Sequence, residues 1–168
     1  YMSDSPYDKR MLFENRITFV QIPAGKMRLY FSIRNFFDLF KTGVGVFFFF
    51  FILFFIYFDF VISKGGYAAF PAVFAARLLR IPVIVHESDS SPGRLNIWTA
   101  KFAKNIAVSW PEAGETLPKE KTALTGQPIR KAILHGSPEG AFDFFKLDPT
   151  LPVIFIYGGS QGADIINN

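Results

Sequence analysis

Residues 60–108 read FVISKGGYAAFPAVFAARLLRIPVIVHESDSSPGRLNIWTAKFAKNIAV, and their alternating pattern decides the fold. Three short apolar runs have the β-branched composition of buried strands, at residues 60–63, 83–86 and 105–108. Helical signals over residues 71–80 and 95–104 separate these runs. Strands that alternate with helices of about ten residues are typical of βαβ units. We therefore expect an α/β fold, with a Rossmann-like parallel sheet and flanking helices.

Further elements are expected on both sides of this stretch. A helix is predicted from Ser32 to Lys41, with Ser32 as its N-cap, and another from Pro128 to Leu134. Additional strands are predicted at residues 17–22, 123–125 and 153–157, the last of which starts a new sheet. The turn-rich residues 135–149 between them indicate a linker or domain boundary. We expect one domain over residues 1–148 and the beginning of a second over 149–168.

The composition narrows the chemistry. The 168 residues include no cysteine and only two histidines, which excludes disulfides and thiolate metal sites. We therefore expect no metal and no cofactor. The net charge of +4 comes without a long basic run, so nucleic acid is not an expected partner. The charge fits either an ordinary solvated surface or affinity for anionic lipid or a diphosphate.

Phenylalanine is unusually frequent, with 22 copies, and eight of them lie between Phe47 and Phe58. Residues 42–58 carry no charge, but this stretch is shorter than the roughly 20 residues that a membrane-crossing helix needs. Charged residues precede any apolar stretch at the start of the sequence, so we expect no secretory signal and a cytoplasmic location.

The segment from Ile33 to Phe58 is expected to lie on a membrane surface. Apolar residues in its first half follow helical spacing, and Arg34 and Lys41 can meet anionic head groups. Its second half is apolar all round, so part of it should be buried against the protein. A crossing helix would also place the strands predicted at 17–22 and 60–63, which we expect in one sheet, on opposite sides of the membrane.

Two glycine-rich turns follow apolar strands, SKGGY at residues 63–67 and GGSQGA at 158–163. Such turns lie at the carboxyl edge of a parallel sheet, where exposed amides attract phosphate. Neither matches the dinucleotide or P-loop pattern. Taken alone, each turn can equally be structural.

Polar residues follow two other strands. His86-Glu87-Ser88-Asp89 ends one of them and is either part of a ligand cleft or a cluster in which Ser88, Asp89 or the next two serines cap the following helix. Arg130, in GQPIR, either binds phosphate at a helix start or is a surface residue.

The order GGY, HESDxxPG, GxPxR and GGSQGA resembles the MurG family, the lipid II-forming N-acetylglucosaminyltransferases of peptidoglycan synthesis. The resemblance covers nearly the whole chain from about Ile17, and GGSQGA is its most specific part. It implies a GT-B glycosyltransferase fold whose N-terminal domain holds the lipid acceptor and whose C-terminal domain holds most of UDP-N-acetylglucosamine. The chain is then expected to be an interior fragment, inactive alone, at the cytoplasmic face of the cell membrane.

The resemblance also implies roles for individual residues. Arg130 and Ser160 match positions that bind the UDP-sugar, and Gln161 lies beside Ser160. The remaining matches are to the acceptor side and the cleft, at Gly65, Gly66, Tyr67, His86, Glu87, Asp89 and Asn96. Three features depart from the family pattern, namely Asp89 where some members have Asn, Ala69-Phe70 after GGY, and the phenylalanine run.

The implied reaction is an inverting transfer, in which a hydroxyl of the undecaprenyl-diphosphate-linked muramoyl-pentapeptide attacks the sugar of UDP-N-acetylglucosamine. It needs a base and groups that stabilise the leaving diphosphate. The expected base belongs to an N-terminal glycine-rich loop that this chain does not contain. The alternatives are another GT-B enzyme, such as a UDP-N-acetylglucosamine 2-epimerase or a lipid glucosyltransferase, or a noncatalytic membrane-binding module.

Overall fold

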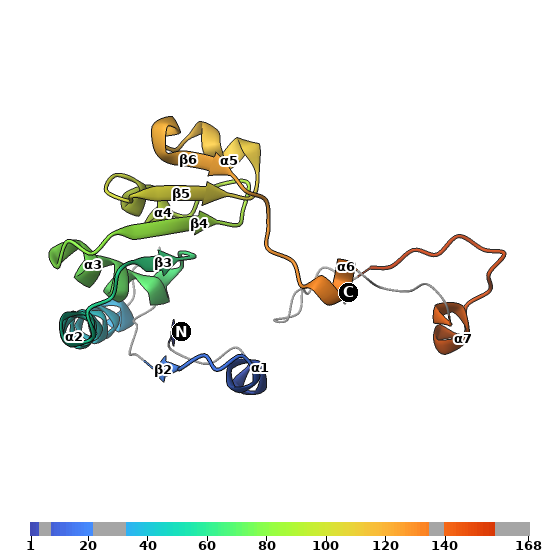
Figure 1. Ribbon diagram of the computed structural model, residues 1–168, viewed down its shortest axis with the longest axis horizontal. Coiled ribbons are helices and arrows are strands. Elements are labelled where there is room, and N and C mark those ends of the chain that lie inside the picture. Colours follow the sequence, from blue (N-terminus) through green and yellow to red (C-terminus); the bar gives the residue numbers. More distant parts are fainter. Residues whose placement is uncertain (4–7, 22–32, 135–139, 157–168) are drawn as a thin grey trace. The chain divides into compact units, whose positions relative to one another are not determined.

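The computed structural model describes residues 1–3, 8–21, 33–134 and 140–156. The chain forms two compact units, Tyr1–Gln127 and Pro128–Asn168. The first contains a four-stranded parallel sheet in the order β3-β4-β5-β6 (Figure 1). Its strands are β3 (Val61–Ser63), β4 (Val83–Glu87), β5 (Asn105–Val108) and β6 (Thr122–Leu124). The α/β fold with a parallel sheet is confirmed, whereas the domain boundary after residue 148 stays a prediction.

Three helices connect these strands, α3 (Phe70–Leu78), α4 (Arg94–Ala100) and α5 (Pro111–Glu115). Two short 3-10 helices, η1 (Tyr67–Ala69) and η2 (Lys119–Lys121), lie in the same connections. Because consecutive strands are parallel neighbours, right-handed crossovers place all three helices on one face of the sheet. Val85, Ile106 and Val108 of that face are buried together with Val73 and Ala100 of the helices. This apolar layer fixes the sheet on which the candidate site is built.

The opposite face of the sheet is less covered within the described residues. Ile62, Ile84, His86 and Ala107 lie on it, because neighbours in register point to the same side. Ile62 is 62% exposed, and Ile84 and His86 are half-buried. His86 and Glu87, adjacent in sequence, therefore belong to opposite faces.

Helix α2 (Ile33–Ile56) is a single helix of 24 residues. It is longer than the predicted helix, which ended at Lys41, because no proline interrupts the apolar residues that follow. Phe49 and Leu53, four residues apart, are buried, and α2 packs against α3. Ser32, the predicted N-cap, lies outside the described residues.

The strands β1 (Met2–Ser3) and β2 (Val20–Gln21) form a separate, two-stranded parallel sheet. The prediction that the strand at 17–22 shares a sheet with residues 60–63 is therefore wrong for the described residues. Strand β2 is also shorter than predicted, because its register pairs only two residues with β1. Ile22 lies outside the described residues.

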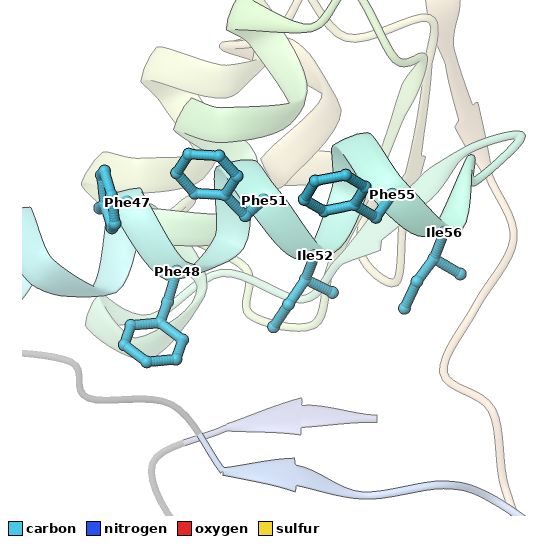
Figure 2. Close-up of a pocket in the computed structure, with 6 residues that line it drawn as sticks. All are labelled: Phe47, Phe48, Phe51, Ile52, Phe55 and Ile56. Carbon is cyan, nitrogen blue, oxygen red and sulfur yellow. The ribbon is translucent and has the colours of Figure 1, made fainter.

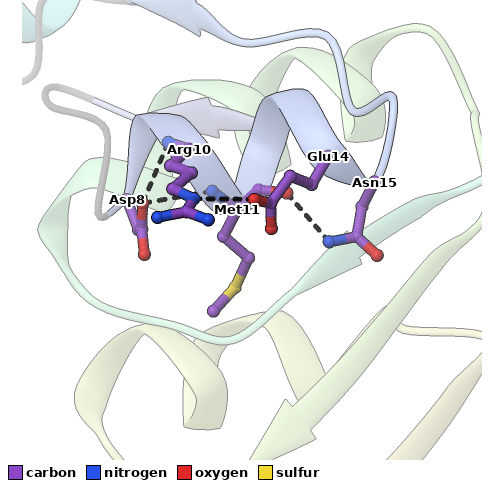
Figure 3. Close-up of polar contacts among 5 residues, drawn as sticks. All are labelled: Asp8, Arg10, Met11, Glu14 and Asn15. Carbon is purple, nitrogen blue, oxygen red and sulfur yellow. Dashed lines mark hydrogen bonds and ion pairs between the residues drawn. The ribbon is translucent and has the colours of Figure 1, made fainter.

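Between β1 and β2 lies α1 (Lys9–Glu14), which the sequence pattern did not predict. Asp8 caps this helix, and its Oδ1 accepts hydrogen bonds from the amides of Arg10 and Met11 (Figure 3). The Arg10 Nε to Glu14 Oε1 ion pair, at 2.7 Å, is largely exposed and stabilises the helix little.

Within its described residues, the second unit contains two short helices, α6 (Lys131–Leu134) and α7 (Ala141–Phe145). Helix α7 falls within the predicted linker. The strand predicted at 153–157 is wrong for residues 153–156, which are exposed and have no regular structure. Tyr157 lies outside the described residues.

Candidate functional site

The carboxyl edge of the four-stranded sheet gathers the loops that follow β3, β4, β5 and β6. Gly65 and Gly66, after β3, have positive φ angles of 82° and 77°, which side chains rarely adopt. Gly66 and Tyr67 are exposed. This edge is where parallel α/β sheets bind ligands.

Glu87, the last residue of β4, organises the loop that follows it. Its side chain is only 3% exposed, and its two carboxylate oxygens accept three described hydrogen bonds. Oε1 accepts from the amide of Asp89 at 3.0 Å, and Oε2 accepts from the amide of Gly93 at 2.9 Å and from Asn96 Nδ2 at 2.8 Å. The carboxylate thereby fixes residues 88–93 and the start of α4.

These contacts also set the protonation of Glu87. Burial raises the pKa of this carboxyl, but hydrogen bonds from the Asp89 amide, Asn96 and the Gly93 and Ser88 amides together hold it below its ordinary value of 4.5. The charged form is therefore favoured in the folded protein.

Glu87→Gln should lower the free energy of unfolding at neutral pH by about 1 to 3 kcal/mol, because an amide donor would face a backbone N–H. A depressed pKa gives stability that is present above the ordinary pKa and is lost as the pH falls through the folded value. Because this loss occurs mainly below the ordinary pKa of 4.5, the variant should lose less stability than the parent between neutral pH and about pH 3. Urea denaturation at both pH values measures this, with exposed Glu112→Gln as control. An equal acid response in parent and Glu87→Gln would contradict the assignment.

The capping cluster considered for Ser88, Asp89 and the two following serines is wrong. The N-cap of α4 is Gly93, with no side-chain cap. Glu87 binds its amide from the strand instead. Asp89 is exposed at the site, and its backbone amide rather than its carboxylate is used in the loop.

His86 contacts the loop that follows β6. Its Nε2 lies 3.4 Å from the carbonyl oxygen of Gly126, and its Nδ1 lies 3.4 Å from Ser88 Oγ. Ser109 Oγ donates to Gln127 Oε1 at 2.9 Å. These contacts hold residues 126–127 across the ends of β4 and β5. Sequence reasoning missed Ser109 and Gln127, although Ser109 directly follows a predicted strand.

Asn96, on α4, joins the two loops that follow β3 and β4. It is 2% exposed, and its amide group lies against Gly65. A Cβ atom at Gly65 would be 2.8 Å from Asn96 Nδ2. Ser63, which begins the SKGGY turn but was given no role of its own, is buried and accepts the Gly65 N–H at 3.2 Å. Gly65, Glu87 and Asn96 are thus brought together at this edge.

The predicted donor residues belong to the second unit. Arg130 is exposed and directly precedes α6. Ser160 and Gln161 lie outside the described residues. In the described ranges, no group of three His, Cys, Asp or Glu side chains could hold a metal ion.

An apolar surface runs along α2, beside its buried residues Phe49 and Leu53. Figure 2 shows Phe47, Phe48, Phe51, Ile52, Phe55 and Ile56 lining a shallow pocket there. We call these six residues the α2 apolar face. Phe47 is 64% exposed and Phe55 is 71% exposed, so large rings meet solvent over several turns. Exposed apolar patches of this kind mark contact surfaces.

The same helix meets the length and composition criteria for crossing a membrane over Phe37–Ile56, a stretch of 20 residues with a mean hydropathy of 2.3. The expectation that the apolar stretch is too short is therefore wrong, because the helix includes the residues before Thr42. Length and composition are weak evidence for a crossing by themselves. Length and composition do not take into account that Phe49 and Leu53 of this helix are buried against the protein.

Residues 2–108 match the model of the glycosyltransferase family 28 N-terminal domain. The chain belongs to glycosyltransferase family 28. The matched range includes the parallel sheet through β5 and the loops that carry Gly65, Glu87 and Asn96.

Two curated relatives of this family 28 chain have the name UDP-N-acetylglucosamine–N-acetylmuramyl-(pentapeptide) pyrophosphoryl-undecaprenol N-acetylglucosamine transferase. That of Treponema denticola is 44% identical over 159 residues, which is 90% of this chain and 40% of the relative. That of Clostridium botulinum is 41% identical over 161 residues, 96% of this chain and 45% of the relative. The chain therefore spans less than half of the length of these relatives.

The crystal structure of Acinetobacter baumannii MurG matches the fold of the chain. The TM-score is 0.57 at 28% sequence identity, over 79% of this chain and 37% of that chain. The resemblance to the MurG family and the expected fold class are confirmed.

Proposed function

We propose that this family 28 chain is part of an enzyme that transfers N-acetylglucosamine from UDP-N-acetylglucosamine to the undecaprenyl-diphosphate-linked muramoyl-pentapeptide, forming lipid II. The observation that carries the proposal is the 44% identity to the Treponema denticola transferase over 90% of the chain. Because the chain spans 40% of that relative, we expect it to be inactive alone.

In this proposal the carboxyl edge of the sheet receives the acceptor diphosphate. The turn at Gly65 and Gly66 has no side chains, which lets a phosphate approach backbone amides, and Gly66 and Tyr67 are exposed. His86 and Asp89 border the same edge. Glu87 and Asn96 lie beneath it and hold the loops.

The donor would be held by Arg130, Ser160 and Gln161. When the acceptor hydroxyl attacks the anomeric carbon, the bond to UDP breaks and negative charge grows on the leaving diphosphate. A guanidinium can bind that charge through two parallel hydrogen bonds. The exposed position of Arg130 leaves it available for this contact.

Arg130→Ala in the complete enzyme should raise the donor Michaelis constant or lower turnover by about 1.5 to 3 kcal/mol, because a hydrogen bond to a charged group is lost. Steady-state kinetics with varied UDP-N-acetylglucosamine measure the change. Lys131→Ala, which removes a neighbouring exposed cation, serves as control. Donor kinetics equal to those of the control would rule out a donor contact for Arg130.

The α2 apolar face supports attachment to the cytoplasmic surface of the cell membrane. Phe49 and Leu53 of the same helix are buried in the core that Met2 and Val20 pack against. A bilayer crossing would remove α2 from this core, whereas surface binding buries the exposed rings and leaves the core intact. Lys41, exposed on α2, can meet anionic head groups.

A complementation experiment tests the function in cells. The complete coding sequence should restore growth of a bacterium depleted of its own lipid II-forming transferase, whereas residues 1–168 alone should not. Failure of the complete protein, when it is expressed and folded, would argue against the proposed activity.

A further inference from the structure

The amide of Asn96 has a fixed orientation. Its Nδ2 donates to Glu87 Oε2 at 2.8 Å, and a carboxylate can only accept, so the nitrogen must face Glu87. Its Oδ1 is buried and has no hydrogen-bond partner within the described residues. The amide group therefore cannot rotate without breaking the hydrogen bond to Glu87.

Gly65 lies directly against this amide. Added to Gly65, a Cβ would be 2.8 Å from Asn96 Nδ2 and 2.9 Å from Oδ1, closer than real Cβ contacts. Gly65 also has a φ of +82°. Two separate requirements, the backbone conformation and the space taken by Asn96, thus demand glycine at this position.

Gly66 has only the first of these requirements. Its φ is +77°, but a Cβ there would meet no atom within 4 Å. A substitution at Gly65 would therefore cause both backbone strain and a clash with Asn96, whereas the same substitution at Gly66 would cause backbone strain alone. Gly66 thus provides a matched control.

We propose that Asn96, held by Glu87, is a positioning residue that sets the conformation of the Gly65-Gly66 turn and thereby its affinity for the diphosphate of a lipid acceptor. This inference rests on the proposed function. Asn96 and Glu87 are 2% and 3% exposed, so they act on a ligand through the turn rather than by touching it. Gly66 and Tyr67 are exposed and present the turn to the ligand.

The test is a pair of double-mutant cycles in the complete enzyme, with steady-state kinetics for a lipid-linked acceptor and for UDP-N-acetylglucosamine. Asn96→Ala alone should raise the acceptor KM and leave the donor KM unchanged. Gly65→Ala should raise the acceptor KM in the parent, and this effect should shrink by about tenfold in the Asn96→Ala background, since contacting residues couple in this range. Gly66→Ala should have the same effect in both backgrounds.

Additive effects of Gly65→Ala and Asn96→Ala, or a change confined to the donor KM, would overturn the positioning role. If Asn96→Ala does not fold, Asn96→Ser replaces it in both cycles. The melting temperatures of the same proteins give a readout that does not depend on activity. Non-additive melting temperatures in an enzyme that transfers no sugar would reject the proposed function while leaving the contact between Asn96 and the turn in place.

Discussion

Phe49→Ala should lower the free energy of unfolding of the first unit by about 3 to 5 kcal/mol, the range for emptying a buried phenylalanine site. Phe49 is 1% exposed and lies in the core where α2 packs on α3. Removing its ring leaves a cavity that the neighbouring helix cannot fill completely. Urea denaturation followed by tryptophan fluorescence measures the loss, because Trp98 packs against the core.

The adjacent Phe48 provides the control. It is 56% exposed, so Phe48→Ala should change the stability by no more than about 0.5 kcal/mol. The two variants remove the same ring from consecutive positions of one helix. Equal losses of stability would mean that the burial of α2 is wrong.

Replacing Phe47, Phe51 and Phe55 together with serine should weaken binding to anionic vesicles by about a thousandfold, because each ring contributes about 1.5 kcal/mol or more on burial. The three rings form a row along α2, with centroids 4.7 Å apart between Phe47 and Phe51 and 6.1 Å apart between Phe51 and Phe55. Because they are exposed, the triple variant should keep its fold. Vesicle sedimentation over a range of lipid concentrations measures the affinity.

Phe13→Ser is the matched control, since Phe13 is 86% exposed on α1, outside the α2 apolar face. It should leave vesicle binding unchanged. Washing membranes with alkaline carbonate distinguishes the mode of attachment, because a surface-bound protein is released and a crossing one is retained. Retention, with residues 1–16 open to protease from the outer side, would contradict surface binding.

The sequence predicted the central strands well, and the reason is physical. Strands β4 and β5 are buried runs of β-branched residues between helices, so their composition alone distinguishes them. The strand predicted at 153–157 has a similar composition, but its described residues are exposed and form no strand. Strand formation depends on neighbours, which composition does not reveal.

The helices that were missed are short. Helix α1 has six residues and α5 has five, too few for a periodic apolar pattern to emerge. Their signals are local, namely Asp8 as an N-cap for α1 and Pro111 in the first turn of α5.

The place of the candidate site residues in the fold was predictable from the sequence, but their contacts were not. Strand order placed the GGY and HESD loops at one edge, and the alternation of a strand could have assigned His86 and Glu87 to opposite faces. The three hydrogen bonds to Glu87 depend on the path of residues 88–93, which no spacing rule determines. The contact between Gly65 and Asn96 likewise appears only once α4 is packed beside the turn.

Transfer by the complete enzyme tests the central claim most directly. Radiolabelled UDP-N-acetylglucosamine and the undecaprenyl-diphosphate-linked muramoyl-pentapeptide would be incubated with the complete enzyme, and the lipid and nucleotide products separated. We predict that one N-acetylglucosamine joins each acceptor, with inversion at the anomeric carbon and release of one UDP, only when the acceptor is present. Conversion of the sugar nucleotide without acceptor, or transfer of glucose to another lipid instead, would contradict the account.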